Sequence, residues 1–337
     1  MRRPVRLVRN VDAGELFDTF LVLSVTTVLL TRLYLHFTGY PEVGSATLHI
    51  AHLLPGGILM LTAILVCLGS INRSSRTVAA VLGGIGFGLF WDELGKFITK
   101  DNNYFFKPTA GIMYLSFVTL YLLLRYVVRR HYHPEDYLAN AVDLALEGTI
   151  GELDPREYQR AHDMLEKADH NHPMFEAAEM LLENARPTKA YSPFFLQRIG
   201  DWLHAPFHFL VQQWWFKRAL WTLFYVYGLS LLATVIFLAV HGSSKPLLDL
   251  LANPSGDPDE VGGISSFISA MYIIWGLVLM HSGRLYDALR RLEVAILINI
   301  FVTQVFLFFS YQFTAVIALL GALVLLVIVR MLMDETK

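Results

Sequence analysis

The chain contains a series of apolar runs, each long enough to cross a membrane as a helix. They lie at about 15–37, 46–69, 77–98, 109–128, 219–241, 264–281, 291–311 and 313–332. A transmembrane helix needs about 20 mostly apolar residues. In lipid the backbone must satisfy its own hydrogen bonds, so such runs form helices. The sequence therefore predicts an all-α, polytopic membrane protein of about eight transmembrane helices with a helical cytoplasmic insert.

The composition supports this class and excludes others. Hydrophobic residues make up 55% of the chain and charged residues 17%, against about 25% charged residues in a soluble domain. The net charge of −2 gives no electrostatic reason to expect nucleic acid as a partner. The high content of hydrophobic residues makes membrane lipids the expected partners. The single cysteine, Cys67, excludes an intrachain disulfide and a zinc site built on several cysteines.

Basic residues predict the orientation of the chain. They gather in the connections on the side of the N-terminus, as Arg2, Arg73, Arg76, Arg129 and Arg284 illustrate. The connections on the other side carry only Lys100, Lys107 and Lys245. Because short cytoplasmic loops are enriched in Lys and Arg, we expect the N-terminal side of this multi-pass protein, and the insert, to be cytoplasmic. Both of its termini would be cytoplasmic.

The hydropathy pattern divides the chain into four segments. Residues 1–130 and 219–337 are predicted membrane domains that hold spans 1–4 and 5–8. Residues 131–192 are predicted to form a cytoplasmic helical domain with helices at about 135–148, 155–169 and 173–185. The pair Asp154-Pro155 suits a helix start, since Asp is a good N-cap and Pro a good first residue.

The fourth segment, residues 193–218, contains both aromatic and basic side chains and no long apolar run. This pattern is typical of an amphipathic helix that lies along the membrane surface. We expect its aromatic side chains to anchor it at the interface, where Trp is enriched. The residues concerned are Trp202, Phe207, Trp214 and Trp215.

Polar residues of the first three spans, and of the loop after span 3, are predicted to converge on one side of the membrane, because span 1 ends, span 2 begins and span 3 ends there. They are Arg32, His36, His49, His52, Asp92, Glu93, Lys96, Asp101, Asn102 and Asn103. Polar side chains inside spans are costly and mark functional sites by default. This cluster is therefore the candidate site.

Two histidines and a carboxylate suit a Zn-like divalent metal with one open position. In that interpretation His49, His52 and Asp92 are the metal ligands, Glu93 is a general base, and Lys96 is a charge partner or an anion holder. Two alternatives use the same residues. The histidines could bond loop backbone while the charges form ion pairs at a helix end, or the charges could line an ion or substrate pathway.

Residues 49–113 also carry a recognisable layout. A helix with histidines and a break at Pro55-Gly56-Gly57 is followed by a glycine-rich helix that ends in Asp92-Glu93, and then by a polar loop. In this layout the stretch resembles the VanZ-like and YjdF-like families of small bacterial membrane proteins. The resemblance implies a bacterial inner-membrane protein, with envelope or glycopeptide-response associations in some relatives.

Three functions are compatible with these features. The first is a metal-dependent enzyme that acts on a lipid or envelope component at an outward-facing site. The second is an ion- or proton-coupled transporter or channel. The third is a sensor or scaffold that docks a partner through the cytoplasmic helices. The expected protein partner is a cytoplasmic protein or a second copy of this chain in a homo-oligomer. The chain has no phosphate-binding P-loop and no GxSxG nucleophile motif.

Overall fold

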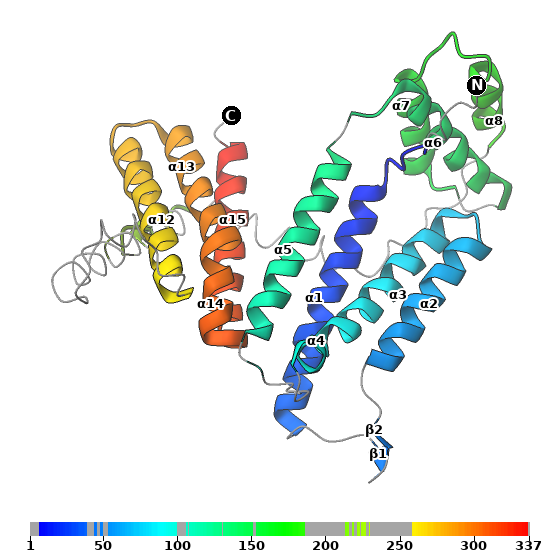
Figure 1. Ribbon diagram of the computed structural model, residues 1–337. Helices are drawn as coiled ribbons and strands as arrows, with labels where there is room; N and C mark the ends of the chain where they lie inside the picture. The colour runs from blue at the N-terminus through cyan, green and yellow to red at the C-terminus, as the bar shows by residue number, and fades with distance from the viewer. Residues whose placement is uncertain are drawn as a thin grey trace, which may run out of the picture. The chain divides into compact units, whose positions relative to one another are not determined.

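The computed structural model describes residues 7–38, 44–45, 48–49, 53–99, 106, 108–129, 131–150, 153–185, 213–215, 218, 221–222, 224–226, 229 and 258–335. In these residues the chain is helical almost throughout (Figure 1). The exception is an antiparallel pair of two-residue strands, β1 (Gly44–Ser45) and β2 (Leu48–His49). The all-α prediction is confirmed for this part of the chain.

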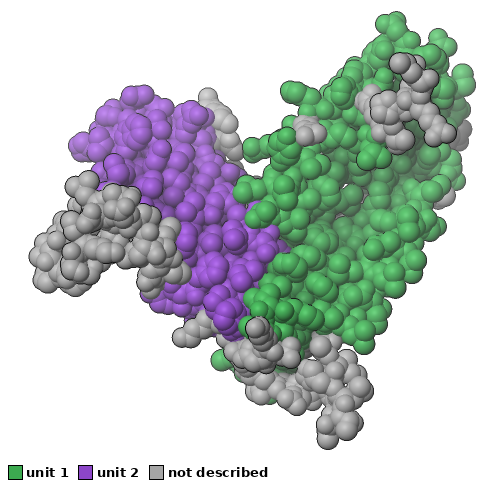
Figure 2. Space-filling model, viewed as in Figure 1, with its two compact units in different colours: residues 1–104, 119–192 green, residues 105–118, 193–337 purple. Residues whose placement is uncertain are grey.

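The chain forms two compact units, coloured green and purple in Figure 2. Unit 1 comprises residues 1–104 and 119–192, and unit 2 comprises residues 105–118 and 193–337. The division falls inside helix α5 (Thr109–Val128), whose first half belongs to unit 2 and whose second half belongs to unit 1. The segment 131–192 belongs to unit 1 together with the first three predicted spans.

Unit 1 contains α1 (Ala13–Thr38), α2 (Leu53–Gly69), α3 (Arg73–Asp92) and the short α4 (Leu94–Ile98), and α3 packs against both α1 and α2. Glycines make these contacts close. A Cβ at Gly88 would lie 2.5 Å from the carbonyl oxygen of Ser24 on α1. A Cβ at Gly86 would lie 2.7 Å from the carbonyl oxygen of Gly56 on α2. Small residues let membrane helices approach to this distance, so α3 is held between its two neighbours.

The predicted insert forms α6 (Pro134–Glu147), the 3₁₀ turn η1 (Gly148–Ile150), α7 (Pro155–Glu166) and α8 (Phe175–Asn184) (Figure 1). These match the three predicted amphipathic helices. Asp154 caps α7 as expected, with its side chain accepting the N–H of Arg156 at 2.7 Å. The three helices share an apolar core that includes Leu138, Leu165 and Leu182.

Unit 2 contains α12 (Pro258–His281), α13 (Leu285–Ile298), a π-helical turn η2 (Asn299–Thr303), α14 (Gln304–Tyr311), the 3₁₀ turn η3 (Gln312–Thr314) and α15 (Ala315–Glu335). Gln312 has a φ of +52°, where the chain reverses. As a result α15 packs back against α13 and α14 (Figure 1). This reversal lies between the predicted spans 291–311 and 313–332.

Four described stretches are long and apolar enough to cross a membrane, which is consistent with a multi-pass membrane protein. They are 13–38, 109–128, 264–281 and 285–333. The last has 49 residues, which at about 1.5 Å per residue exceeds one bilayer crossing. It is doubled back at Gln312 and corresponds to predicted spans 7 and 8.

The expected eight spans are not confirmed. Predicted span 2 corresponds to the 17-residue α2, which begins only at Leu53. Predicted span 3 corresponds to α3 and α4, and α3 begins with Arg73 and Arg76 and is rich in glycine, which lowers its hydropathy. Predicted span 219–241 lies outside the described residues, except at 221–222, 224–226 and 229.

Candidate functional site

The candidate site lies where α3 ends. Asp92 is the last residue of α3, Glu93 interrupts the helix, and α4 resumes at Leu94. Both acidic residues are buried, with 0% of each residue's surface exposed. Charged groups are rarely buried this fully unless they are paired, so the partners of these two carboxylates decide what the site can do.

Arg32 of α1 holds the first carboxylate. Its Nε lies 2.6 Å from Asp92 Oδ1, and its Nη2 donates to the backbone oxygen of Asp92 at 2.9 Å. Charge-assisted bonds of this kind are roughly twice as strong as neutral ones. The contact joins α1 to the end of α3 and neutralises Asp92.

Lys96 of α4 holds the second carboxylate. Its Nζ lies 2.8 Å from Glu93 Oε2, one helical turn away. The Glu93 side chain is 1% exposed, whereas that of Lys96 is 27% exposed. The Arg32 side chain is likewise more exposed than its partner, at 13% against 0% for Asp92. We call these four side chains the charged centre; in it the carboxylates are covered and the cations retain some surface.

An indole sits beside the charged centre. Trp91 stacks on Phe87, with ring centroids 5.2 Å apart. Its Nε1 is buried and has no hydrogen-bond partner among the described residues. Sequence reasoning did not select Trp91, because an aromatic residue in an apolar helix does not by itself indicate a site.

The remaining predicted site residues are not brought to the charged centre within the described residues. His36 is exposed near the end of α1, with its ring edge-on to Phe37 at 5.8 Å. His49 belongs to β2, but its side chain is not described. His52, Asp101, Asn102 and Asn103 lie outside the described residues.

The metal site therefore stays a prediction. No group of three or more His, Cys, Asp or Glu side chains that could hold a metal occurs in the part of the chain that the structure describes. The side chains of two of the three predicted ligands, His49 and His52, are not described. The third, Asp92, is already engaged by Arg32.

The predicted interfacial segment is described only near its end. Trp202 and Phe207 lie outside the described residues. Trp214 and Trp215 are 67% and 49% exposed, and the guanidinium of Arg218 lies 4.9 Å from the Trp214 ring centroid. Exposed aromatic and basic side chains suit a membrane interface, and this role stays a prediction.

A second ionic cluster lies at the opposite ends of α1 and α3, against the insert. Asp12 accepts Arg73 Nε at 3.0 Å and Arg160 Nη2 at 2.6 Å. The backbone N–H of Arg73, in the first turn of α3, donates to Glu147 Oε1 at 2.6 Å. Arg73 also pairs with Glu157. We call this set the insert clamp, because it fastens α6 and α7 to the starts of α1 and α3.

From the sequence, Arg73 and Arg76 were used to predict which side of the membrane is cytoplasmic, and the insert clamp was not predicted. A usable signal was present in α6, where Asp143 and Glu147 are one turn apart and so share a helix face. Arg76 pairs with Asp143, and Glu147 accepts the N–H of Arg73.

No family model matches the chain, and comparisons with curated proteins and with solved structures found no match. The resemblance of residues 49–113 to the VanZ-like and YjdF-like families therefore stays a prediction.

Proposed function

We propose that the protein acts on an anionic membrane lipid or envelope component at the charged centre. The observation that carries this proposal is the difference in exposure within each ion pair. Arg32 and Lys96 keep 13% and 27% of their side-chain surface, while Asp92 and Glu93 keep 0% and 1%. A ligand that reaches the centre therefore meets its cations first.

Phosphate is the lipid group that best fits these cations. A guanidinium presents a planar fork of donors that matches phosphate, and an ammonium is a compact positive charge that also binds it. Asp92 and Glu93 then hold the two cations in place and offset their charge. Charged side chains within apolar helices cost free energy and mark functional sites by default.

The enzyme form of the proposal adds a metal bound by His49 and His52 with Asp92. A Zn-like ion there would supply a Lewis acid and an activated water, and Glu93 would serve as the general base. Its support is the packing of α2 on α3. A Cβ at Gly56 would lie 2.8 Å from the backbone nitrogen of Phe90. His52 lies four residues before Gly56 in the sequence.

In this proposal the protein belongs to a bacterial inner membrane. Both termini and helices α6–α8 are cytoplasmic, and the charged centre faces the other side. The arginines near the insert support this orientation, because cytoplasmic flanks are rich in Arg. Arg73 and Arg76 begin α3 at that end.

Charge-neutral double variants test the site without leaving a buried charge unpaired. They are Arg32→Gln/Asp92→Asn and Glu93→Gln/Lys96→Gln. The matched control is Arg284→Gln/Asp287→Asn, which removes an exposed ion pair of α13 with Nη2 and Oδ2 2.7 Å apart. Each protein is placed in nanodiscs of mixed phosphatidylglycerol and phosphatidylcholine, and bound lipid is identified by native mass spectrometry.

We expect the wild type and the control to retain phosphatidylglycerol preferentially. The two site variants should lose that preference about tenfold, the equivalent of one good charge-assisted bond. Unchanged preference in both site variants would reject the anionic ligand. Thermal unfolding of each variant confirms that it is folded.

A sensor is the second candidate, and the insert clamp favours it. Asp12 binds Arg160 of α7, and Arg73 binds Glu147 and Glu157 of the insert, so the insert is fastened to the starts of α1 and α3. The Arg32–Asp92 contact joins the same two helices near their other ends. Ligand binding at the charged centre could then alter how α6–α8 are held. Hydrogen exchange of residues 134–184 that changes with phosphatidylglycerol content would support the sensor, and identical exchange would reject it.

A further inference from the structure

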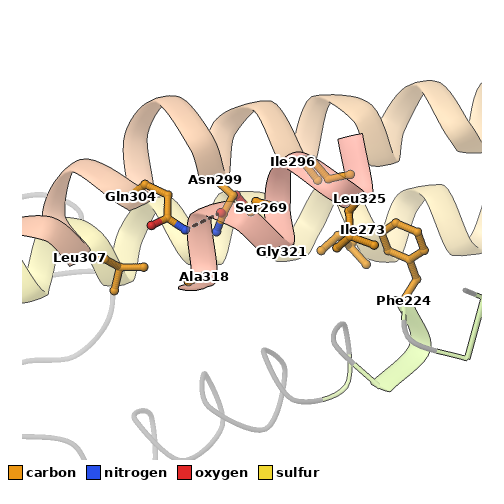
Figure 3. A pocket seen from close by; sticks show the side chains of 12 residues that line it. Phe224, Ser269, Ile273, Ile296, Asn299, Gln304, Leu307, Ala318, Gly321 and Leu325 are labelled. Atoms are coloured by element: carbon orange, nitrogen blue, oxygen red, sulfur yellow. Dashed lines mark hydrogen bonds between the residues drawn. The ribbon is translucent and has the colours of Figure 1, made fainter. Parts of the chain in front are cut away.

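Unit 2 contains a cavity of about 300 Å³ between α12, α13, α14 and α15 (Figure 3). Most of its described lining is apolar, with Phe224, Ile273, Ile296, Leu307 and Leu325 contributing walls. No charged side chain is among the described residues that line it. Cavities of this size and polarity are at the small end of ligand-binding pockets.

Two polar atoms in the lining have no partner. They are Ser269 Oγ and Gln304 Oε1, which are buried and accept or donate no hydrogen bond among the described residues. Both side chains are only 1% exposed. Buried polar atoms nearly always form a hydrogen bond, and a buried polar atom that forms none costs free energy. Their position on a cavity leaves room for a ligand that would supply the missing bonds.

The amide of Gln304 is held in a defined orientation. Its Nε2 donates to Asn299 Oδ1 at 3.3 Å, and Figure 3 shows the two amides side by side. This bond occupies the nitrogen end of the Gln304 amide and leaves the Oε1 acceptor to line the cavity.

The backbone between these two residues is a π-helical turn, η2. Turns of this kind occur frequently at functional sites. Two contacts fix it from outside the cavity: Thr303 Oγ1 lies 3.0 Å from Ser265 Oγ on α12, and Tyr114 Oη donates to the backbone oxygen of Ile300 at 2.6 Å. The first contact joins this turn to α12 across the two helices.

We propose that this cavity binds a neutral lipid alcohol. The ligand hydroxyl would donate to Gln304 Oε1 and accept from Ser269 Oγ, and its hydrocarbon would lie along Ile273, Leu307 and Leu325. A carboxylate or phosphate does not fit, because no described cation lines the cavity to balance it. This site is separate from the charged centre, and its ligand is chosen by hydrogen bonding alone.

Gly321 provides a way to close the cavity. It lines the cavity, and a Cβ built on it meets nothing within 4 Å. Gly321 is exposed, so it lines the open side of the cavity. We expect Gly321→Leu to cover this side, and the change also replaces a helical glycine with a better helix former. The matched control is Gly69→Leu in unit 1, where a Cβ also meets nothing within 4 Å.

The test uses the full chain in detergent and a long-chain primary alcohol that carries a photoreactive diazirine. Its methyl ether, which cannot donate a hydrogen bond, is the comparison probe. After irradiation, labelled peptides are identified by mass spectrometry. We expect the alcohol to label residues 264–281 and 296–325, with labelling at least tenfold lower in Gly321→Leu and unchanged in Gly69→Leu.

The polar contacts are tested separately. Gln304→Leu and Ser269→Ala should each lower alcohol labelling several-fold, and the methyl ether should label the wild type as weakly as the alcohol labels Gln304→Leu. Equal labelling of wild type and Gly321→Leu would show a packing void only. Equal labelling by alcohol and ether would show unspecific partition of hydrocarbon. Either result, or no labelling of these peptides, overturns the proposal.

Discussion

Arg32 bonds Asp92 at two points, through Nε to the carboxylate at 2.6 Å and through Nη2 to the backbone oxygen at 2.9 Å. The second bond uses one of the carbonyls that a helix leaves unsatisfied at its end. A single side chain of α1 therefore both neutralises a buried charge and caps the end of α3.

Removing Arg32 alone should cost more stability than removing the whole pair. Arg32→Gln leaves Asp92 buried and unpaired, which we expect to cost about 3–5 kcal/mol. Arg32→Gln/Asp92→Asn removes the charge as well and should be clearly less destabilising. Chemical unfolding in detergent, analysed as a double-mutant cycle, measures the difference. Additive effects of the two single changes would contradict a direct ion pair.

The contact of α1 with α3 should depend on the absence of a side chain at Gly88. A Cβ there would lie 2.5 Å from the backbone oxygen of Ser24, so Gly88→Ala must push the helices apart. We expect a loss of about 1–3 kcal/mol, as for other overpacked sites. Gly57→Ala is the control, since a Cβ there meets nothing within 4 Å. Helix propensity predicts that the control gains up to about 1 kcal/mol in thermal unfolding. Equal stability changes would show that the close approach is not needed.

Loss of Asp12 should loosen the insert without unfolding it. Asp12 accepts one arginine from α3 and one from α7. Asp12→Asn should cost roughly 1–2 kcal/mol, because Arg160 is partly exposed and solvent screens its share. Limited proteolysis should then cut faster between α6 and α8. Asp163→Asn changes an exposed acidic residue of α7 and should leave the cutting rate as in the wild type. Equal cutting of wild type and Asp12→Asn would rule out the clamp.

Much of the fold could be predicted because the signals are local. Apolar length alone located α1, α5 and residues 264–281, since each helix that lies in lipid must be apolar by itself. The start of α7 followed from Asp154 and Pro155, which act on their own first turn. These features do not depend on which other segments lie nearby.

The partners of the charged residues could not be predicted in the same way. An arginine such as Arg73 at a helix end suits lipid headgroups and distant carboxylates equally, and only the folded chain shows Asp12 and Glu157 beside it. At the charged centre the spacing allowed Lys96 to pair with either Asp92 or Glu93. The choice follows from Arg32, which occupies Asp92 and leaves Glu93 to Lys96.

Metal content decides whether the charged centre has the histidine ligands proposed for it. We expect about one transition metal per chain in purified wild type, the stoichiometry of a mononuclear catalytic site. His49→Ala/His52→Ala should lose it, since Asp92 alone does not retain an ion while Arg32 lies 2.6 Å from its Oδ1. His36→Ala, which removes an exposed histidine of α1, should keep it. Inductively coupled plasma mass spectrometry of the three proteins measures the metal. Absence of metal from the wild type would reject the enzyme form of the proposal and leave lipid phosphate as the group that Arg32 and Lys96 bind.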